Sequence, residues 1–297
     1  MRVLIFGAGA VGGVLAAMLS PRHELDVAAR DGRLLRIADE GITIQGAVER
    51  TERPGTRPRG RYDMVFIATK AYDVVAASEE MMTFVDGNTI IISPQNGLGH
   101  LDVLAERFGD RVVLAPTTLG AAVVGPTTVR LASAGTTVVG SPSGRAERAA
   151  EVAAVLNEAG LRSEASDNIM GEVWMKAIVN ACINPIAALA GIPNGVLLGR
   201  KPLLTIAEMT CSEAVATAEA SGITLTRRDA FAWVKEVMRS TSENRCSMLQ
   251  DLENGRRTEI DEINGELVQK GEAKGIPMRV NRSLWTMVRT AEGRRMP

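Results

Sequence analysis

The chain has few of the residues that bind nucleic acid, metal ions or membranes. Aromatic residues make up 3% of its 297 positions and the formal net charge is -1, so it lacks both stacking side chains and a positive field. It has 2 histidines, and its 3 cysteines form no CxxC pair, which argues against a zinc site. No apolar stretch reaches the roughly 20 residues that span a bilayer without an interrupting glycine or charge. We therefore expect a cytoplasmic protein with reduced thiols, no metal, no nucleic acid and no membrane.

A glycine-rich turn near the N-terminus is the clearest feature that the chain does have. Residues 3–6 are an apolar run typical of a buried parallel strand, and Gly7, Gly9 and Gly12 follow it with G-x-G-x-x-G spacing. The next residues begin an apolar helix, whose N-terminal N–H groups bind anions. A glycine turn that only packs a helix on a strand is the alternative, but this context favours a dinucleotide site. The expected cofactor-binding residues of this turn are Gly7, Ala8, Gly9, Ala10, Val11 and Gly12.

The end of the second predicted strand indicates which dinucleotide binds. An Asp or Glu at this point normally holds a free ribose 2′-OH, whereas this chain has Ala28, Ala29 and Arg30. The guanidinium of Arg30 suits a 2′-phosphate. An ordinary solvated arginine is the alternative, but no acid occupies the strand end, so we expect NADP(H) rather than NAD(H).

The pattern of strands and helices changes once along the chain. Up to about residue 166, apolar strands alternate with helices, which predicts a doubly wound, Rossmann-type α/β domain with a parallel sheet. From residue 167 the pattern is helical throughout, so we expect an NADP-binding domain at 1–166 and an all-α substrate or catalytic domain at 167–297. The expected strands are 2–6, 25–29, 42–44, 64–68, 89–92 and 112–115, with helices at 10–20, 31–40, 73–83, 98–107 and 145–159, a hairpin at 123–139 that turns at 132–135, and a surface loop at 50–61. The expected helices of the second domain are 168–184, 201–221, 228–240, 242–254, 260–274 and 279–292.

One helix of the second domain carries an unusual polar stripe. Lys176, Asn180 and Asn184 follow one another at i, i+4 and i+8 and share a helix face, while their neighbours are apolar. Amides and an ammonium are costly in such surroundings unless a polar group meets them. A solvent-facing stripe is the alternative; two asparagines, which are poor helix formers, favour a site. Pro185 predicts that the helix ends or kinks at Asn184.

A second group of candidate residues lies at 244–265. It contains Asn244, Ser247 and Glu259. Glu259 stands at a predicted helix start, where Thr258 or Asp261 can cap, so its carboxylate is equally suited to supporting a helix N-terminus. The pattern alone leaves both interpretations open.

These motifs together resemble the ketopantoate reductases (2-dehydropantoate 2-reductases), nearly end to end. The most specific are Lys-x3-Asn-x3-Asn-Pro at 176–185 and Ser-Met-x-Gln-Asp at 247–251, followed by Thr-Glu-Ile-Asp at 258–261. The resemblance implies that Lys176 is the general acid of a 2-keto acid reduction and that Glu259 orders it. It also implies that Asn180, Asn184, Asn244 and Ser247 bind substrate, and that Lys70 and Asn96 lie where nicotinamide meets substrate.

The resemblance implies a function, with two alternatives. We expect NADPH-dependent reduction of 2-dehydropantoate to (R)-pantoate, which serves pantothenate and coenzyme A biosynthesis. Another branched 2-keto acid is the first alternative. A non-catalytic NADP-binding sensor is the second, although such a sensor is expected to have lost Lys176 and Glu259. Apolar residues recur widely around 201–221 and 279–292, which suggests a homodimer.

Overall fold

The chain folds into two units, and each has its own set of packed elements. The computed structural model describes residues 1–29 and 32–293. The first unit is formed by Met1–Gln95 and His100–Ile169, and the second by Asn96–Gly99 and Met170–Pro297. The short segment Asn96–Gly99 thus belongs with the second unit, although it follows a strand of the first.

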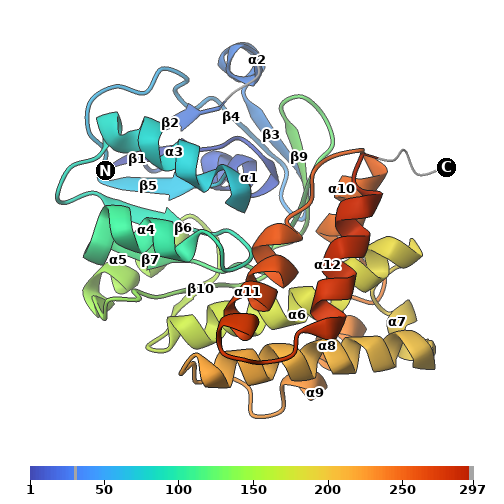
Figure 1. Ribbon diagram of the computed structural model, residues 1–297. Coiled ribbons are helices and arrows are strands. Elements are labelled where there is room, and N and C mark those ends of the chain that lie inside the picture. The colour runs from blue at the N-terminus through green and yellow to red at the C-terminus, as the bar shows by residue number, and fades with distance from the viewer. Residues whose placement is uncertain (30–31, 294–297) are drawn as a thin grey trace. The chain divides into compact units, whose positions relative to one another are not determined.

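The first unit is built on a five-stranded sheet in the order β2-β1-β5-β6-β7, and every pair in it is parallel (Figure 1). Gly55 bridges in parallel to Asp26 at the outer edge of β2. The strand order reverses at β1, which has β2 on one side and β5 on the other, so the carboxyl ends of β1 and β5 are where such sheets bind ligands. The strands are β1 (Arg2–Phe6), β2 (Glu24–Ala28), β5 (Met64–Ile67), β6 (Ile90–Ser93) and β7 (Val112–Leu114).

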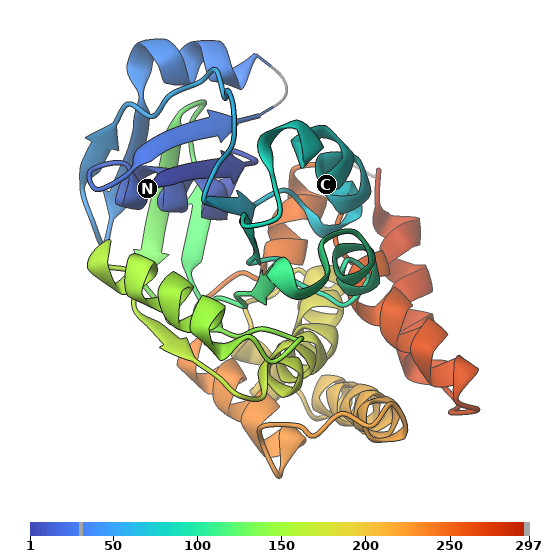
Figure 2. The ribbon, with the colours of Figure 1, turned by 90° about the vertical axis from the view of Figure 1, so that its left-hand side faces the viewer.

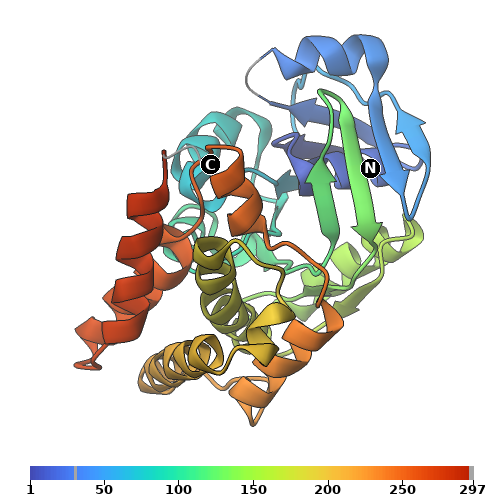
Figure 3. The same ribbon diagram turned by 90° about the vertical axis from the view of Figure 1, so that its right-hand side faces the viewer.

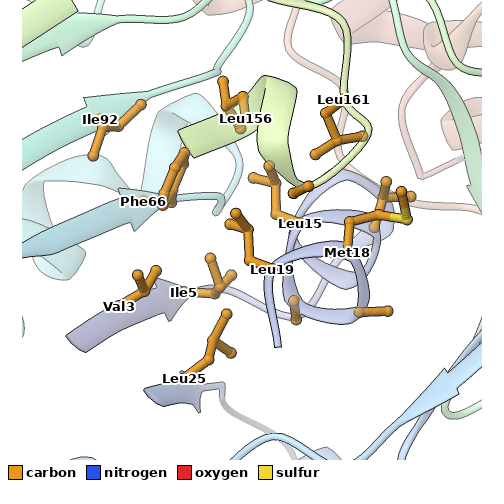
Figure 4. Packing of buried hydrophobic residues seen from close by; sticks show 14 of the residues in the cluster. Val3, Ile5, Leu15, Met18, Leu19, Leu25, Phe66, Ile92, Leu156 and Leu161 are labelled. Atoms are coloured by element: carbon orange, nitrogen blue, oxygen red, sulfur yellow. The ribbon is translucent and has the colours of Figure 1, made fainter. Parts of the chain in front are cut away.

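Helices cover both faces of this sheet because its strands are apolar on both sides. Leu15 and Leu19 of α1 and Leu156 of α5 face Ile5 and Phe66 of the sheet (Figure 4). The α3 and α4 helices lie on the other face (Figure 2). Burial on both faces is typical of a parallel sheet in an α/β protein. The helices are α1 (Ala10–Leu19), α2 (Arg33–Glu40), α3 (Val74–Glu80), α4 (Leu101–Phe108) and α5 (Ala146–Glu158), with short 3-10 turns at Ala71–Asp73, Met81–Phe84 and Gly109–Arg111.

A second, four-stranded sheet corrects three of the predictions. Its order is β4-β3-β9-β8, where β3 runs parallel to β9 (Figure 3). The 42–44 strand therefore does not join the main sheet, and the 50–61 loop contains a strand. The predicted hairpin turns at 124–127 rather than at 132–135, because β8 pairs with β9. The strands are β3 (Ile42–Gly46), β4 (Arg50–Glu52), β8 (Gly120–Val123) and β9 (Thr128–Ser133); a separate parallel pair is β10 (Thr137–Val139) and β11 (Ser163–Ala165).

The misplaced hairpin turn has a physical cause at Gly135. Its φ is +54°, and a Cβ there would lie 2.5 Å from the backbone of Thr118. The glycine is thus needed for a close approach between chain segments, whereas the pattern suggested a hairpin turn. Gly125 and Pro126 form the actual turn, where the Gly125 N–H donates to the Thr128 carbonyl.

The second unit consists of helices, and the predicted fold class is confirmed. The α8 helix packs against α7, α9, α11 and α12. The predicted start of the 242–254 helix is too early, since this helix begins at Ser247; the 260–274 helix is present, and its first turn, Asp261–Gly265, is π-helical. The helices are α6 (Ile169–Ala190), α7 (Val196–Gly199), α8 (Lys201–Ala220), α9 (Ala230–Ser240), α10 (Ser247–Glu253), α11 (Glu266–Ala273) and α12 (Arg279–Ala291).

The long α6 helix carries the polar stripe. It continues through Pro185 to Ala190, so the expected helix end at Asn184 is wrong. The helix is long enough to cross a membrane, and its most apolar 18-residue stretch has a mean hydropathy of 1.4. However, 72% of that stretch is buried inside the protein. Such burial is that of the core helix of a folded domain.

Candidate active site

The glycine turn of the first unit has the geometry of a dinucleotide site. Gly7 has φ +113°, and a Cβ on it would lie 2.7 Å from the Thr69 nitrogen at the end of β5. A Cβ on Gly12 would lie 1.9 Å from the Gly7 carbonyl oxygen, so α1 packs directly on the turn. Gly9 precedes α1 and a Cβ there would meet nothing closer than 3.9 Å. The turn is therefore closed toward the sheet at Gly7 and Gly12 and open at Gly9, where backbone N–H groups can approach a pyrophosphate.

The loops after β5 and β6 lie beside each other at the carboxyl ends of the strands. Lys70 is half-buried and directly precedes the 3-10 turn Ala71–Asp73. The Gln95 Nε2 donates to Thr69 Oγ1 at 3.5 Å, and Ser93 Oγ donates to Gln95 Oε1 at 2.5 Å. The sequence pattern did not single out Thr69 and Gln95. Their position next to Lys70 is set by the pairing of distant strands.

Arg33 contacts the glycine turn. Arg30 lies outside the described residues. Arg33, the first residue of α2, donates from Nη1 to the Ala8 carbonyl at 2.6 Å. The sequence pattern did not reveal Arg33 because its contact depends on how α2 folds back toward the glycine turn.

The polar stripe of α6 is not a solvent-facing surface. Lys176 and Asn180 are half-buried, and Asn184 is 7% exposed. Their neighbours Trp174, Ile178 and Ile183 are buried apolar side chains. The α6 helix therefore holds one ammonium and two amides at the boundary of an apolar core, as expected for groups that meet a polar ligand.

Glu259 is a buried carboxylate whose neighbours come from three parts of the chain. It is 7% exposed, and its Oε2 accepts a hydrogen bond from Asn96 Nδ2 at 3.2 Å. The adjacent Thr258 donates its N–H and its hydroxyl to Glu292 Oε1, at 2.8 and 2.7 Å. The Thr258 hydroxyl also accepts the Ile260 N–H at 3.2 Å, but Ile260 is the N-cap and no side chain caps this helix start, so the predicted cap by Thr258 or Asp261 is wrong. Asp261 has another partner, since its Oδ1 accepts the Trp285 Nε1–H at 2.6 Å.

Asn96 is held against this segment by its own loop. The Leu98 N–H donates to the Glu262 carbonyl at 2.8 Å. Gly97 has φ +84°, and a Cβ on it would lie 2.3 Å from that same carbonyl oxygen. The segment Asn96–Gly99 therefore fits closely on the π-helical turn of the same unit, and this contact places the Asn96 amide at Glu259.

The electrostatics of Lys176 follow from burial and from Glu259. Burial lowers the pKa of Lys176 from 10.5 to about 8, and interaction with the Glu259 carboxylate raises it and offsets part of that shift. Near neutral pH the ammonium is thus protonated but ready to give up its proton. A general acid works best with a pKa close to the working pH.

Asn244 and Ser247 are exposed. The chain around them is hydrogen-bonded to α6 at Asn184 and to the segment that follows α6. The Cys246 thiol, next to Ser247, donates to the Asn184 carbonyl at 3.5 Å and accepts the Leu249 N–H at 3.4 Å. The Asn244 carbonyl accepts the Asn194 N–H at 3.0 Å. The start of α10 is thereby joined to the end of the polar stripe.

Two buried asparagines of the second unit were not predicted as functional. Asn194 donates from Nδ2 to Thr241 Oγ1 at 3.0 Å, and Asn264 donates from Nδ2 to the Ala181 carbonyl at 3.3 Å. Within the described part of the chain, the Oδ1 atom of each is buried without a hydrogen-bond partner. Asparagine in a sequence is normally a surface residue, so the burial of these two follows from the fold alone, although Asn264 belongs to the group of candidate residues at 244–265.

The cysteines are poorly suited to chemistry of their own. Cys182, Cys211 and Cys246 are buried free thiols, and burial raises the pKa of Cys182 well above its ordinary value. A nucleophilic role for Cys182 is thus disfavoured. Among residues 1–29 and 32–293, no group of three or more His, Cys, Asp or Glu side chains is placed to hold a metal ion.

Comparisons with known proteins first identify the class of protein, which is an oxidoreductase. Residues 3–144 match the family model described as ketopantoate reductase PanE/ApbA, and residues 168–292 match its C-terminal model. A 2-dehydropantoate 2-reductase of Archaeoglobus fulgidus is 37% identical over 295 residues, which cover 98% of each chain. A crystal structure of a PanE/ApbA family ketopantoate reductase from Ralstonia eutropha JMP134 superposes with a TM-score of 0.91 at 29% identity, covering 98% of each chain. A complex of D-mandelate dehydrogenase with NADH gives a TM-score of 0.88 at 25% identity over 98% of this chain and 99% of that one.

The chain belongs to the ketopantoate reductase family. Both of its units match the family, and the curated relative is matched along nearly its whole length.

Proposed function

We propose that the protein is a 2-keto acid reductase that uses NADPH to reduce 2-dehydropantoate to (R)-pantoate. The observation that carries this proposal is the half-buried Lys176, whose pKa is about 8, beside the buried Glu259. A sensor protein has no use for an ammonium tuned to release a proton, and burying it has a cost in stability.

The chemistry assigns a separate task to each group of residues. Reduced nicotinamide, when bound, supplies the hydride that adds to C2 of the keto acid. The carbonyl oxygen gains negative charge as the carbonyl double bond breaks, and the Lys176 ammonium stabilises that charge and donates the proton that completes the hydroxyl. Glu259 keeps Lys176 protonated and oriented, since its carboxylate raises the pKa of the lysine. Lys176 then regains a proton from solvent before the next turnover.

The remaining candidates are assigned to binding. Asn180, Asn184, Asn244 and Ser247 would hold the carboxylate and hydroxyl of the substrate through hydrogen bonds, because amides and hydroxyls both donate and accept. Asn96 would contribute to both substrate and cofactor. Accordingly, we assign cofactor binding to the first unit and substrate binding to the second.

The glycine turn suits a dinucleotide, and Arg30 favours NADPH. The residues that would hold the pyrophosphate are Gly7 to Gly12, where the open position at Gly9 leaves room for it. Arg30 replaces the acid that would bind a free ribose 2′-OH, and Lys70 would lie near the nicotinamide. The NADH in the D-mandelate dehydrogenase complex is the reason to measure both cofactors.

Oxidation of NADPH and NADH, followed at 340 nm with several 2-keto acids, tests the proposal. We expect ketopantoate with NADPH to give the highest kcat/KM among ketopantoate, 2-ketoisovalerate, benzoylformate and pyruvate. The similarity to D-mandelate dehydrogenase makes benzoylformate the second candidate, since it is the keto acid of mandelate. If no 2-keto acid were reduced, the enzymatic proposal would be rejected.

The cellular setting is part of the same proposal. We place the enzyme in the cytoplasm, where thiols stay reduced, and we propose a homodimer. The exposed Met209 of α8 and Met287 of α12 are apolar side chains that a partner copy would cover.

A further inference from the structure

Pro185 leaves one carbonyl of α6 without its usual helical partner. In an α-helix the N–H of residue i donates to the carbonyl of residue i−4, and proline has no N–H. Pro185 lies inside α6, so the Ala181 carbonyl cannot receive the normal bond. A buried carbonyl without a partner is costly, and Ala181 is 0% exposed.

The amide of Asn264 takes the place of the missing N–H. Asn264 Nδ2 donates to the Ala181 carbonyl at 3.3 Å and also to Asn281 Oδ1 at 3.0 Å. Asn264 and Asn281 are both 0% exposed. Asn281 in turn donates from Nδ2 to Glu213 Oε2 at 2.9 Å, and that carboxylate also accepts the Val280 and Asn281 N–H groups at the start of α12. A chain of hydrogen bonds, buried at Asn264 and partly buried at Glu213, thus runs from α6 through Asn264 to α8 and α12.

Among the residues that the structure describes, the side chain of Asn264 is satisfied as a donor but not as an acceptor. Its Oδ1 is buried without a hydrogen-bond partner among the described residues. Leaving a buried polar atom unpaired is unfavourable, and residues of this kind are typically kept for function.

The backbone around Asn264 is also specialised. The Gly265 N–H donates to the Ile260 carbonyl, five residues back, so the helix widens into a π-turn at this point. The Ile263 N–H donates to the Glu259 carbonyl at 3.1 Å, which attaches the turn to the residue that carries the buried carboxylate. Single π-helical turns inside helices are frequently found at functional sites.

We propose that Asn264 is a positioning residue that fixes the Glu259 segment against α6 at the carbonyl left free by Pro185. One hydrogen bond, from Asn264 to the Ala181 carbonyl, thereby connects the helix that carries Lys176 with the turn that follows Glu259. This inference rests on the proposed function, in which Lys176 and Glu259 work as a pair. Asn264 acts through Glu259 and is not expected to contact the substrate.

Replacing Asn264 by leucine removes both hydrogen bonds that Asn264 donates and keeps the branching at Cγ, although leucine is the larger residue. We expect Asn264→Leu to lower kcat by about tenfold or more, since small misplacements of catalytic groups have effects of that size, and to leave the NADPH KM unchanged. Pro185→Ala restores an N–H that competes for Ala181, so a milder loss of roughly threefold in kcat is expected. The double variant Pro185→Ala/Asn264→Leu gives Ala181 a helical partner again. It should recover the part of the melting temperature that the unpaired Ala181 carbonyl costs in Asn264→Leu, but not the part due to the lost bond to Asn281 Oδ1, and not the lost kcat.

A direct measurement on Lys176 keeps the test independent of turnover. The ¹³Cε signal of Lys176, assigned by its loss in Lys176→Met, is titrated in each variant. Weaker contact with Glu259 lowers the Lys176 pKa, so Asn264→Leu and the double variant should titrate at lower pH than wild type. Asn157→Ala is the matched control, because Asn157 also donates to a backbone carbonyl, that of Ser163 at 2.8 Å, in the first unit. Its melting temperature should fall while kcat and the Lys176 titration stay as in wild type.

The outcomes separate the two proposals. A double variant that regains wild-type kcat and Lys176 titration would show that Asn264 only stabilises the fold, and the inference would be overturned. If wild type reduces no 2-keto acid, the proposed function fails, but the titration still decides whether Asn264 sets the state of Lys176. If Asn264→Leu does not fold, Pro185→Ala must still lower the Lys176 pKa. An unchanged Lys176 titration in Pro185→Ala would then overturn the inference that Asn264 positions Glu259.

Discussion

Replacing Lys176 by methionine should stabilise the protein while abolishing its chemistry. Burial lowers the pKa of Lys176 from 10.5 to about 8, even with Glu259 acting in the opposite direction. This pKa difference lowers the free energy of unfolding by about 3 kcal/mol at any pH where the ammonium is protonated in both the folded and the unfolded chain. Because the side chain is half-buried, this is an upper limit. Methionine has a similar length and carries no charge, so Lys176→Met removes the cost.

The pH dependence of this effect has a definite sign. Below about pH 8 both states hold the proton, and the full cost is present. Between about pH 8 and 10.5 the folded protein releases the proton and the unfolded chain keeps it, so wild type gains stability relative to the variant. The advantage of Lys176→Met should therefore fall from up to about 3 kcal/mol near pH 7 to about 1.4 kcal/mol near pH 9.5.

Urea unfolding followed by tryptophan fluorescence measures the difference. Trp174, Trp233 and Trp285 all lie in the second unit, so the signal reports the unit that contains Lys176. Groups that do not interact with Lys176 titrate alike in both proteins and cancel in the difference. An advantage that is the same at both pH values, or a variant less stable than wild type near pH 7, would refute a desolvated ammonium at this position.

Four further outcomes are expected. Lys176→Ala should lower kcat by about 10²-fold or more with little change in NADPH binding, as measured by steady-state kinetics and fluorescence titration, whereas near-normal turnover would make the lysine structural. Glu259→Ala should affect both kcat and KM, and the fall of kcat with rising pH should begin at lower pH than in wild type, because the carboxylate no longer raises the pKa of Lys176. Arg30→Ala should weaken NADPH binding by about 1.5 to 3 kcal/mol and NADH binding little; an unchanged cofactor ratio contradicts this. Sedimentation at micromolar concentration should give a dimer, and a clean monomer of 31.7 kDa would reject it.

The glycine turn and its flanking strand and helix could be predicted because their signals are local. The apolar strand, the glycines and the helix start of residues 2–19 are consecutive, and each glycine has a steric reason that the fold bears out at Gly7 and Gly12. The same holds for the alternation of strands and helices, which set the fold class. Patterns with a short period are read from neighbouring residues alone.

The second sheet was not predictable because its pairing is not local. Thr43 of β3 pairs with Thr128 of β9, which lies on the far side of the whole β5–β7 region in the sequence. Nothing in residues 42–46 distinguishes a strand of this sheet from one of the main sheet, since apolar strands suit both. Pairing over such separations depends on tertiary packing, which a single sequence shows only indirectly.

Pro185 illustrates the same limit within a helix. A proline predicts a helix end because it removes one hydrogen bond and clashes with the preceding turn. The α6 helix nevertheless continues to Ala190, and the carbonyl that loses its partner is bonded by Asn264. The compensation comes from a segment far along the chain, so the local rule was correct about the lost bond and wrong about its consequence.

The two members of the proposed catalytic pair differ in how far the sequence reveals them. Lys176 belongs to a stripe of period four on an apolar helix, and a polar stripe in such surroundings implies a polar partner. Glu259 has no such stripe, and its burial is made tolerable by Asn96, by the Thr258–Glu292 contacts and by Lys176, which are separated along the chain by most of its length. A buried carboxylate is kept only where several such partners converge, so its role follows from the fold rather than from its neighbours. The pattern around Glu259 therefore left a helix cap and a catalytic group equally open, and burial at 7% exposure with the Asn96 amide at 3.2 Å is what favours the second.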